Sequence, residues 1–334
     1  MLRRENSSTL SVVVPAYNEE DVLEAFHTRL AAVLEQLPHR SEIIYVNDGS
    51  SDSTLSILRR LRGADRRIGI VDLSRNFGKE IALTAGLDQA VGDAVIVIDA
   101  DLQDPPELIP DLVRAWRDEA VDVVYAQRIA RDGETPLKRY TASMFYRLMV
   151  RLGEVPIPAN TGDFRLLSRQ ALDSVKQLRE RHRFMKGVFA WVGFSQKAVP
   201  YHRDARLAGS TKWNYWKLWN LAIEAITSAT VAPLRLASYL GIVIALLAFA
   251  AGTWVVVKTL LYGDDVQGWP SLMVAVLFMG GVQLVCLGIL GEYLGRIFNE
   301  TKGRPLYLLR AVAPSTLSTP WEDSSAEVAL ESGS

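Results

Sequence analysis

Two long apolar runs in the last third of the chain constrain its fold more than any other feature. Residues 237–261 contain a single charged residue, Lys258, and residues 271–290 contain none. As a helix, the first run extends about 37 Å at 1.5 Å per residue, which is enough to cross a bilayer. A buried core hairpin is the alternative, but two uncharged runs of this length argue against it. We therefore predict two transmembrane helices within residues 236–294.

The charges around these runs predict their orientation. The joining loop, residues 262–270, is acidic, whereas basic residues flank the pair on its outer sides: Arg235, Arg296, Lys302 and Arg304. The positive-inside rule then places the protein in the inner membrane as a multi-pass protein with both termini in the cytoplasm. Residues 1–9 lack the apolar segment of a signal peptide, and we expect them to be disordered.

Strands and helices alternate through the first 126 residues. Apolar runs rich in β-branched residues predict strands at residues 10–14, 42–46, 68–73, 93–98 and 121–126. Helical spacing predicts helices at residues 22–37, 54–61, 78–90 and 107–116. This order is typical of an α/β fold with a parallel sheet and right-handed crossovers. Function is then expected at the carboxyl ends of the strands, in a domain of residues 10–210.

An acidic stretch follows the fourth of these strands. In an extended chain Asp99 and Asp101 would point to the same side, and Gln103 adds a neutral oxygen. Such oxygen ligands suit a Mg²⁺ or Mn²⁺ ion that holds a diphosphate. An Asp-x-Asp tripeptide alone is more often a solvated turn than a metal site. The prediction therefore depends on the preceding strand, on Gln103, and on Pro105 and Pro106, which suit a helix start.

Other loops at this edge suit a nucleotide. No Gly-x-Gly-x-x-Gly follows the first strand, which argues against an NAD enzyme. Tyr17 offers a ring and Asp48 a carboxylate for a base or ribose, although both also suit an ordinary turn. Residues 74–79 place cations and backbone N–H groups at a helix start, which suits a phosphate; a solvated basic loop is the alternative.

The pattern changes after residue 130. Residues 128–151 form a basic amphipathic segment, typical of an interfacial or packing helix. Asp163 and Arg165 share one side of a strand, where a structural salt bridge is the alternative to a site. Residues 213–219 are rich in Trp and resemble a membrane-interface belt, with a core cluster as the alternative. We predict an interfacial region at 211–235, a cytoplasmic juxtamembrane segment at 295–312 and a disordered tail at 313–334.

The composition argues against two features. The net charge of −1 does not favour binding to nucleic acid, and a chain with the single cysteine Cys286 cannot form an internal disulfide.

Seven motifs in order resemble those of the family 2 glycosyltransferases of GT-A fold. More narrowly, the chain resembles the polyprenyl-phosphate sugar transferases, which include dolichol-phosphate mannose synthases, and most of all the bactoprenol glucosyltransferases with two C-terminal membrane helices. The motifs lie at residues 14–20, 47–50, 75–79, 99–107, 162–165, 209–212 and 290–296.

The resemblance implies a Rossmann-like, mostly parallel GT-A domain followed by interfacial helices and the two membrane helices. It implies nucleotide binding by Pro15, Ala16, Tyr17, Glu19, Asp48, Lys79 and Asp99, and metal binding by Asp99, Asp101 and Gln103. It implies a catalytic group of Arg128, Asp163, Arg165 and Lys212, with the basic residues at phosphates and Asp163 beside the reacting sugar. Asn47 departs from the family, because many members carry Asp there.

The implied reaction is inverting transfer of a hexose, with glucose from UDP-glucose favoured, to undecaprenyl or another polyprenyl phosphate, with Mg²⁺ or Mn²⁺. GDP-mannose, UDP-N-acetylhexosamine and UDP-aminoarabinose are alternative donors. The acceptor phosphate is anionic at neutral pH and needs little general base, so Asp163 is a base, a neighbour of the metal or a group that orients sugar hydroxyls. The expected partners are the donor, the lipid and the membrane, with a second copy of the chain as a further candidate.

Two rival functions carry different signatures. A processive polysaccharide synthase has a Gln-x-x-Arg-Trp element and usually more membrane spans, and this chain contains no Arg-Trp dipeptide. A membrane-anchored nucleotide-sensing scaffold would bind nucleotide without releasing sugar.

Overall fold

The computed structural model describes residues 8–129, 161–181, 183, 185–201, 232–262 and 268–318. The chain separates into two compact units. The larger unit contains Val155–Asn214 together with most of the earlier residues, and it resumes at Arg304, whereas the smaller unit contains Tyr215–Gly303. The predictions for residues 130–160 and 202–231, including Lys212 and residues 211–231 of the interfacial region, lie outside the described residues.

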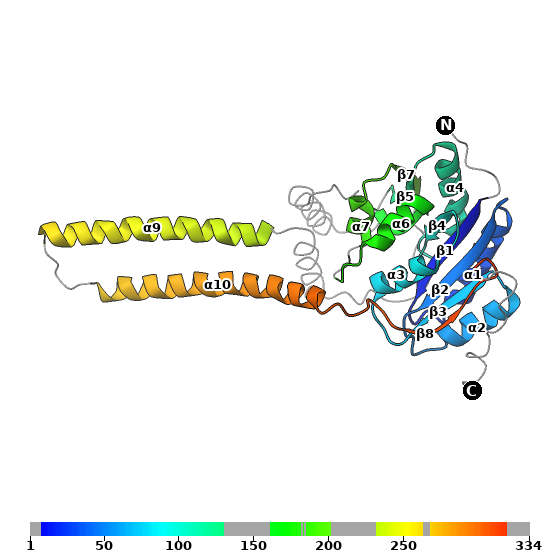
Figure 1. Ribbon diagram of the computed structural model, residues 1–334, viewed down its shortest axis with the longest axis horizontal. Helices are drawn as coiled ribbons and strands as arrows, with labels where there is room; N and C mark the ends of the chain where they lie inside the picture. The colour runs from blue at the N-terminus through cyan, green and yellow to red at the C-terminus, as the bar shows by residue number, and fades with distance from the viewer. Residues whose placement is uncertain are drawn as a thin grey trace. The chain divides into compact units, whose positions relative to one another are not determined.

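An eight-stranded sheet forms the centre of the larger unit (Figure 1). The strands are β1 (Thr9–Ala16), β2 (Arg40–Asn47), β3 (Ile68–Leu73), β4 (Ala94–Val97), β5 (Val123–Arg128), β6 (Thr161–Ser168), β7 (Gln196–Tyr201) and β8 (Leu309–Ala313). Their order is β7-β5-β6-β4-β1-β2-β3-β8, and β4, β1, β2 and β3 are parallel neighbours. The predicted α/β fold with a mostly parallel sheet is confirmed.

Helices cover both faces of this sheet. Val12 and Val14 of β1 pack in one apolar core, whereas Val13 packs in the core on the opposite face. Side chains alternate along a strand, so burial on both faces requires the continuous apolar run that predicted the strand. One face carries α1 (Leu23–Glu35), α2 (Thr54–Ala64) and α4 (Ile109–Asp118), which follows the short 3-10 helix η1 (Pro106–Leu108); the other carries α3 (Lys79–Gln89), α6 (Arg169–Gln177) and α7 (Met185–Trp191).

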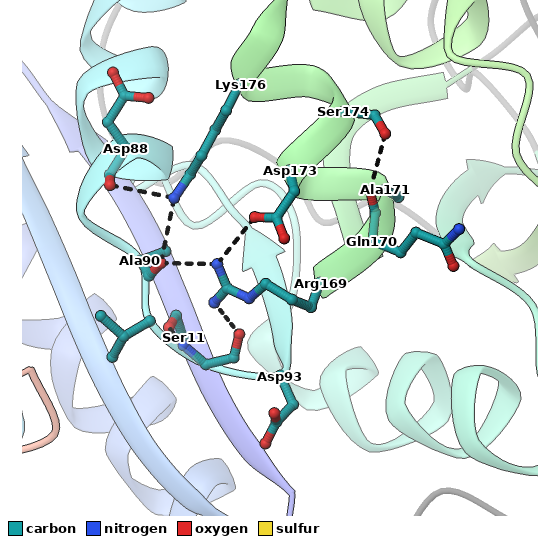
Figure 2. A network of polar contacts seen from close by, with 12 residues as sticks. Ser11, Asp88, Ala90, Asp93, Arg169, Gln170, Ala171, Asp173, Ser174 and Lys176 are labelled. Atoms are coloured by element: carbon teal, nitrogen blue, oxygen red, sulfur yellow. Dashed lines mark hydrogen bonds and ion pairs between the residues drawn. The ribbon is translucent and has the colours of Figure 1, made fainter.

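Two basic side chains of α6 bind the carboxyl end of α3 (Figure 2). Arg169 donates to the carbonyl oxygen of Ala90 at 3.1 Å and to that of Gly92. Lys176 donates to the carbonyl oxygen of Asp88 at 3.2 Å. A helix leaves unpaired carbonyls at this end, where its dipole also favours cations. The contact holds α6 against α3, and with it the end of β6, the strand that leads into α6.

Two strands depart from the predicted topology. β6 runs antiparallel between β4 and β5, so the fourth and fifth predicted strands are not neighbours. β8 comes from beyond the apolar runs and pairs antiparallel with β3. It belongs to the larger unit, so the predicted domain of residues 10–210 is incomplete.

The predicted disordered tail begins too early. Ala313 is the last residue of β8, and Ser315 is buried, with its hydroxyl bonded to the buried carboxylate of Glu42. The polar composition that suggested disorder instead supplies a partner for an acid that would otherwise be costly to bury. Residues 319–334 lie outside the described residues.

The smaller unit contains two long helices, α9 (Ala232–Tyr262) and α10 (Trp269–Thr301). Their windows Ala237–Trp254 and Phe278–Thr301 have mean hydropathies of 1.8 and 1.4, and neither window is buried. Large apolar side chains such as Phe249 and Leu284 are exposed along them. Helices of this length and composition suit a membrane, in agreement with the two predicted spans. The predicted orientation stays a prediction.

Candidate active site

The candidate site lies at the edge of the sheet where β1, β2 and β4 end. The loops that follow these strands contain Tyr17, Asp48 and Asp99. Because β6 runs antiparallel to β4, its first residues lie where β4 ends, and this brings Asp163 to the same edge. The sequence places Asp163 on a strand but does not reveal this neighbour.

Lys79 joins Asp99 and Asp163. It is the first residue of α3, and its Nζ lies 2.6 Å from Asp99 Oδ2 and 2.7 Å from Asp163 Oδ2. Three residues that the sequence analysis assigned to the site therefore meet. The sequence places Lys79 at a phosphate and does not indicate its two carboxylate partners.

Burial and ion pairing oppose each other in this cluster. Burial disfavours the charge on Lys79, but Asp99 and Asp163 outweigh it and raise the pKa of the ammonium. Burial raises the pKa of Asp99, and Lys79 offsets this only in part. Burial also acts to raise the pKa of Asp163, but Lys79, Lys186 and Arg165 together hold that pKa below its ordinary value. Asp163 is therefore ionised at neutral pH.

One oxygen of Asp163 is left for a ligand. Oδ2 accepts from Lys79, whereas Oδ1 is buried and has no hydrogen-bond partner among the described residues. A buried polar atom without a partner costs free energy, so a cation or a hydroxyl group that binds there is favoured.

The acidic loop after β4 forms a turn. Asp101 Oδ1 accepts a hydrogen bond from the backbone N–H of Gln103 at 3.0 Å. Leu102 between them has a φ of 58°, a left-handed conformation that costs a non-glycine residue roughly 1–3 kcal/mol. The prediction that Asp99 and Asp101 face one side of an extended chain is therefore wrong in its geometry, because the turn begins at Ala100.

The side chains of this loop fit a divalent cation by type. Carboxylate and amide oxygens are the ligands of Mg²⁺, which binds through one or two carboxylates plus substrate phosphates. The unpartnered Asp163 Oδ1 lies at the same edge. Within the described residues, no group of three or more His, Cys, Asp or Glu could hold a metal by itself. A divalent cation at this loop would therefore need oxygens of a bound phosphate as further ligands.

Arg128 belongs to a cluster beneath this loop. Tyr201 donates to the buried carboxylate of Asp104, Arg128 Nε donates to Tyr201 Oη at 3.1 Å, and Arg128 Nη2 lies 3.6 Å from Asp104 Oδ1. A Cβ at Gly162 would lie 3.0 Å from Arg128 Nη2, so a larger residue there would have to displace the end of this side chain. Sequence reasoning missed Asp104 and Tyr201; the place of Asp104 directly after Gln103 was the available signal. The predicted phosphate contact of Arg128 stays a prediction.

Asp48 fastens the loop of residues 74–78. Its Oδ1 accepts from the backbone N–H of Phe77 at 2.7 Å and its Oδ2 from that of Gly78 at 2.9 Å. Burial raises the pKa of Asp48 despite these two bonds. Gly49 has a φ of 64°, and a Cβ there would overlap the backbone of Arg75. Both carboxylate oxygens thus already have partners, and the predicted base or ribose contact of Asp48 stays a prediction.

Asn47 is turned into the sheet. Its Nδ2 donates to Asp72 Oδ1 at 2.7 Å, and its Oδ1 accepts from the backbone N–H of Ser50 at 3.2 Å. A carboxylate at position 47 would face that of Asp72. An Asn at position 47, where many family members carry Asp, therefore suits the neighbouring Asp72 because its amide can donate a hydrogen bond to that carboxylate.

The loop after β1 is open toward a ligand. Pro15 and the buried Ala16 end the strand, and Tyr17 after them is 46% exposed. The backbone N–H of Glu19 donates to Thr54 Oγ1 at 2.9 Å, which fixes the turn. The exposed ring is available to stack on a base.

Arg165 lies within the protein behind Asp163. It is 5% exposed, and its Nη2 donates to the carbonyl oxygen of Gly162 at 2.9 Å. Its guanidinium lies 4.1 Å from the centre of the Phe189 ring, and burial lowers its pKa to about 10. These contacts fix the backbone that carries Asp163, whereas the predicted phosphate contact stays a prediction.

Sequence reasoning also missed Glu80. Its Oε2 accepts from the backbone N–H of Met185 at 3.2 Å, which ties α3 to the start of α7. Burial, together with the nearby Asp163, raises the pKa of Glu80 to about 7. Nothing in the local sequence distinguishes it from a surface acid.

Comparison with known proteins gives two matches along the chain. Residues 11–176 match the family described as Glycosyl transferase family 2, and residues 232–297 match the family described as GtrB C-terminal hairpin. An uncharacterised glycosyltransferase of Synechocystis sp. is 57% identical over 90% of this chain and 94% of its own length. The bactoprenol glucosyl transferase of Shigella phage SfX is 47% identical over 90% of this chain and 99% of its own.

Solved structures share less. Glucosyl-3-phosphoglycerate synthase from Mycobacterium tuberculosis, solved with Mn²⁺, UDP-glucose and phosphoglyceric acid, is 22% identical and covers 66% of this chain and 78% of its own, with a TM-score of 0.48.

Proposed function

This chain belongs to glycosyl transferase family 2, and on that premise we propose that it transfers glucose from UDP-glucose to a polyprenyl phosphate at the membrane. Relatives named bactoprenol glucosyl transferase align with both the sheet-forming residues and the apolar hairpin. The observation that carries the proposal is the meeting of Asp99, Lys79 and Asp163 at the carboxyl ends of the strands.

The reaction joins two anionic partners. The bond between the anomeric carbon and the diphosphate oxygen breaks, an oxygen of the acceptor phosphate forms the new bond from the opposite side, and UDP leaves. The acceptor is already anionic at neutral pH, so the enzyme must chiefly position the partners and neutralise their charge.

The residues divide these tasks. Asp99, Asp101 and Gln103 would hold a Mg²⁺ or Mn²⁺ ion, which neutralises the leaving diphosphate when bound. The Lys79 ammonium adds positive charge at the same place, and the Tyr17 ring stacks on the base. Asp163 Oδ1 accepts from a sugar hydroxyl or takes part in holding the cation.

The apolar helices hold the enzyme where its lipid acceptor is. α9 and α10 suit a bilayer by length and composition. With both termini in the cytoplasm, as the flanking charges favour, the donor comes from the cytoplasm and the acceptor phosphate from the inner leaflet.

Membranes that contain the full chain test this function. They are incubated with undecaprenyl phosphate and radiolabelled UDP-glucose, GDP-mannose, UDP-N-acetylglucosamine or UDP-aminoarabinose, and the lipid is then extracted. We expect label in the lipid with UDP-glucose and loss of that label with EDTA. Absence of lipid label from every donor would overturn the proposed transfer, and label from another donor but not from UDP-glucose would overturn the assignment of glucose.

The metal role has its own test. Asp101→Ala should abolish transfer, whereas Asp111→Ala, which removes an exposed acid paired with Arg114 on α4, should leave it unchanged. Retained transfer in the Asp101→Ala protein would refute a cation held by this loop.

A further inference from the structure

The strand that follows α10, β8, lies beside the loop that leads into the candidate active site. β8 pairs with β3 so that Ala311 lies opposite Asp72 and Leu309 opposite Leu73. The register shifts between these two pairs and leaves Arg310 as the extra residue. A bulge of this kind redirects a side chain, here that of Arg310.

Arg310 contacts two groups at the end of β3. Its Nη2 donates to the carbonyl oxygen of Ser74 at 2.8 Å, and its Nη1 lies 3.7 Å from Asp72 Oδ2. That oxygen is buried and has no hydrogen-bond partner within the part of the chain that the structure describes, so the guanidinium supplies its counter-charge. The backbone N–H of Ser74 in turn donates to the carbonyl oxygen of Leu308 at 2.9 Å. The chain around β8 therefore holds both polar backbone groups of Ser74.

Ser74 begins the loop of residues 74–78 that leads to Lys79. Asp48 holds the far end of this loop through Phe77 and Gly78. The loop is thus fixed at its far end by Asp48, which follows β2, and at its start by the chain around β8. It leads to the Lys79 ammonium that bridges Asp99 and Asp163.

We propose that Arg310 is a positioning residue for the nucleotide sugar, and that the strand after the hairpin completes the donor site by fixing residues 74–78. The proposal rests on the proposed function. Arg310 is exposed at the edge of the sheet, so its contribution to the apolar core is small. A guanidinium can bind the Ser74 carbonyl and face Asp72 together because its donors form a planar fork, whereas an ammonium is a point charge.

The test compares full-length Arg310→Ala, Arg310→Lys and Arg62→Ala proteins. Arg62 is the matched control because its Nη2 donates to the carbonyl oxygen of Pro314, which follows β8. Hydrogen exchange of peptides covering residues 74–78 and the kinetics of transfer are measured for each protein.

In Arg310→Ala we expect faster exchange at residues 74–78 and a donor KM raised about tenfold, the size expected for one charge-assisted hydrogen bond, with kcat and the acceptor KM within about twofold. Arg310→Lys should fall between this variant and the wild type, and Arg62→Ala should keep the wild-type donor KM. Unchanged exchange and donor KM in Arg310→Ala would overturn the proposal, as would an equal rise in Arg62→Ala. Hydrogen exchange needs no turnover, so it tests whether Arg310 fixes residues 74–78 even if the wild type transfers no sugar. Absence of transfer by the wild type would overturn the proposed function and not the role of Arg310 in this loop.

Discussion

Replacing Lys79 by Met tests the centre of the site. The Lys79 ammonium lies 2.6 and 2.7 Å from two carboxylates whose side chains are only 24% and 12% exposed. Removing one partner of a buried ion pair costs about 3–5 kcal/mol, because the other charge stays buried. Lys79 itself is 45% exposed, so solvent screens part of this interaction. We therefore expect Lys79→Met to lower the free energy of unfolding by about 2 kcal/mol. The leaving diphosphate also loses one charged hydrogen-bond donor, worth about 1.5–3 kcal/mol, so kcat/KM should fall roughly 30-fold.

Lys197 offers a matched control for this variant. Its side chain is also 45% exposed and its Nζ also lies 2.7 Å from a carboxylate, but the partner Glu119 is 46% exposed. Exposed pairs contribute about 0–1 kcal/mol, so Lys197→Met should stay within about twofold of the wild type. The assay is initial-rate transfer of label to lipid at varied UDP-glucose, with melting temperatures of both proteins. Equal activity of Lys79→Met and Lys197→Met would refute the reasoning.

Two further substitutions probe the surroundings of the site. Because burial raises the pKa of Glu80 to about 7, above its unfolded value, its contribution to stability is complete below about pH 4.5 and is lost as the pH rises through 7. Glu80→Gln should remove this pH-dependent contribution and raise the free energy of unfolding at pH 8 by roughly 2–3 kcal/mol. Thermal melts of both proteins in detergent across pH 5–8 measure the effect. Equal pH dependence of the two proteins would contradict it. Asn47→Asp should destabilise the protein by about 3 kcal/mol at pH 7.5 and by less at pH 5, because two carboxylates then meet where the Asn47 amide donates at 2.7 Å to Asp72. Thermal melts at the two pH values test this. A loss of stability that does not depend on pH would argue against charge repulsion.

The central strands could be predicted because burial on both faces dictates their composition. β1 to β4 need continuous apolar runs, and turn residues mark where each run ends. β8 follows the hairpin, and no local pattern says that its five residues join the edge of β3. β6 lies between β4 and β5, and the hydrophobic periodicity of the sequence does not predict which strands pair.

Several residues that the sequence assigns to the site meet in the structure, but the sequence does not predict the contacts between them. Asp99 and Asp163 were both assigned to it, but the bridge through Lys79 depends on the antiparallel direction of β6. Asp101 was assigned from an extended geometry, whereas the turn with Leu102 in the left-handed region sets its direction. Motifs name the side chains that a site needs, and tertiary pairing decides which of them meet.

The acidic side chains at this edge of the sheet have two kinds of role, which depend on the hydrogen-bond partners of their oxygens. Some hold neighbouring loops in place, and others can bind a ligand. Asp48 has both oxygens bonded to backbone N–H groups, and Asp104 accepts from Tyr201 beside Arg128, so both shape loops. Asp163 keeps a buried oxygen that has no hydrogen-bond partner among the residues described, and this oxygen can therefore take a new one. It follows that Asp48→Asn should act chiefly on the donor KM, through the loop of residues 74–78, whereas Asp163→Asn should act on kcat. Steady-state kinetics of the two variants separate these effects, and a change in kcat alone for Asp48→Asn would show that this acid contacts the reacting groups.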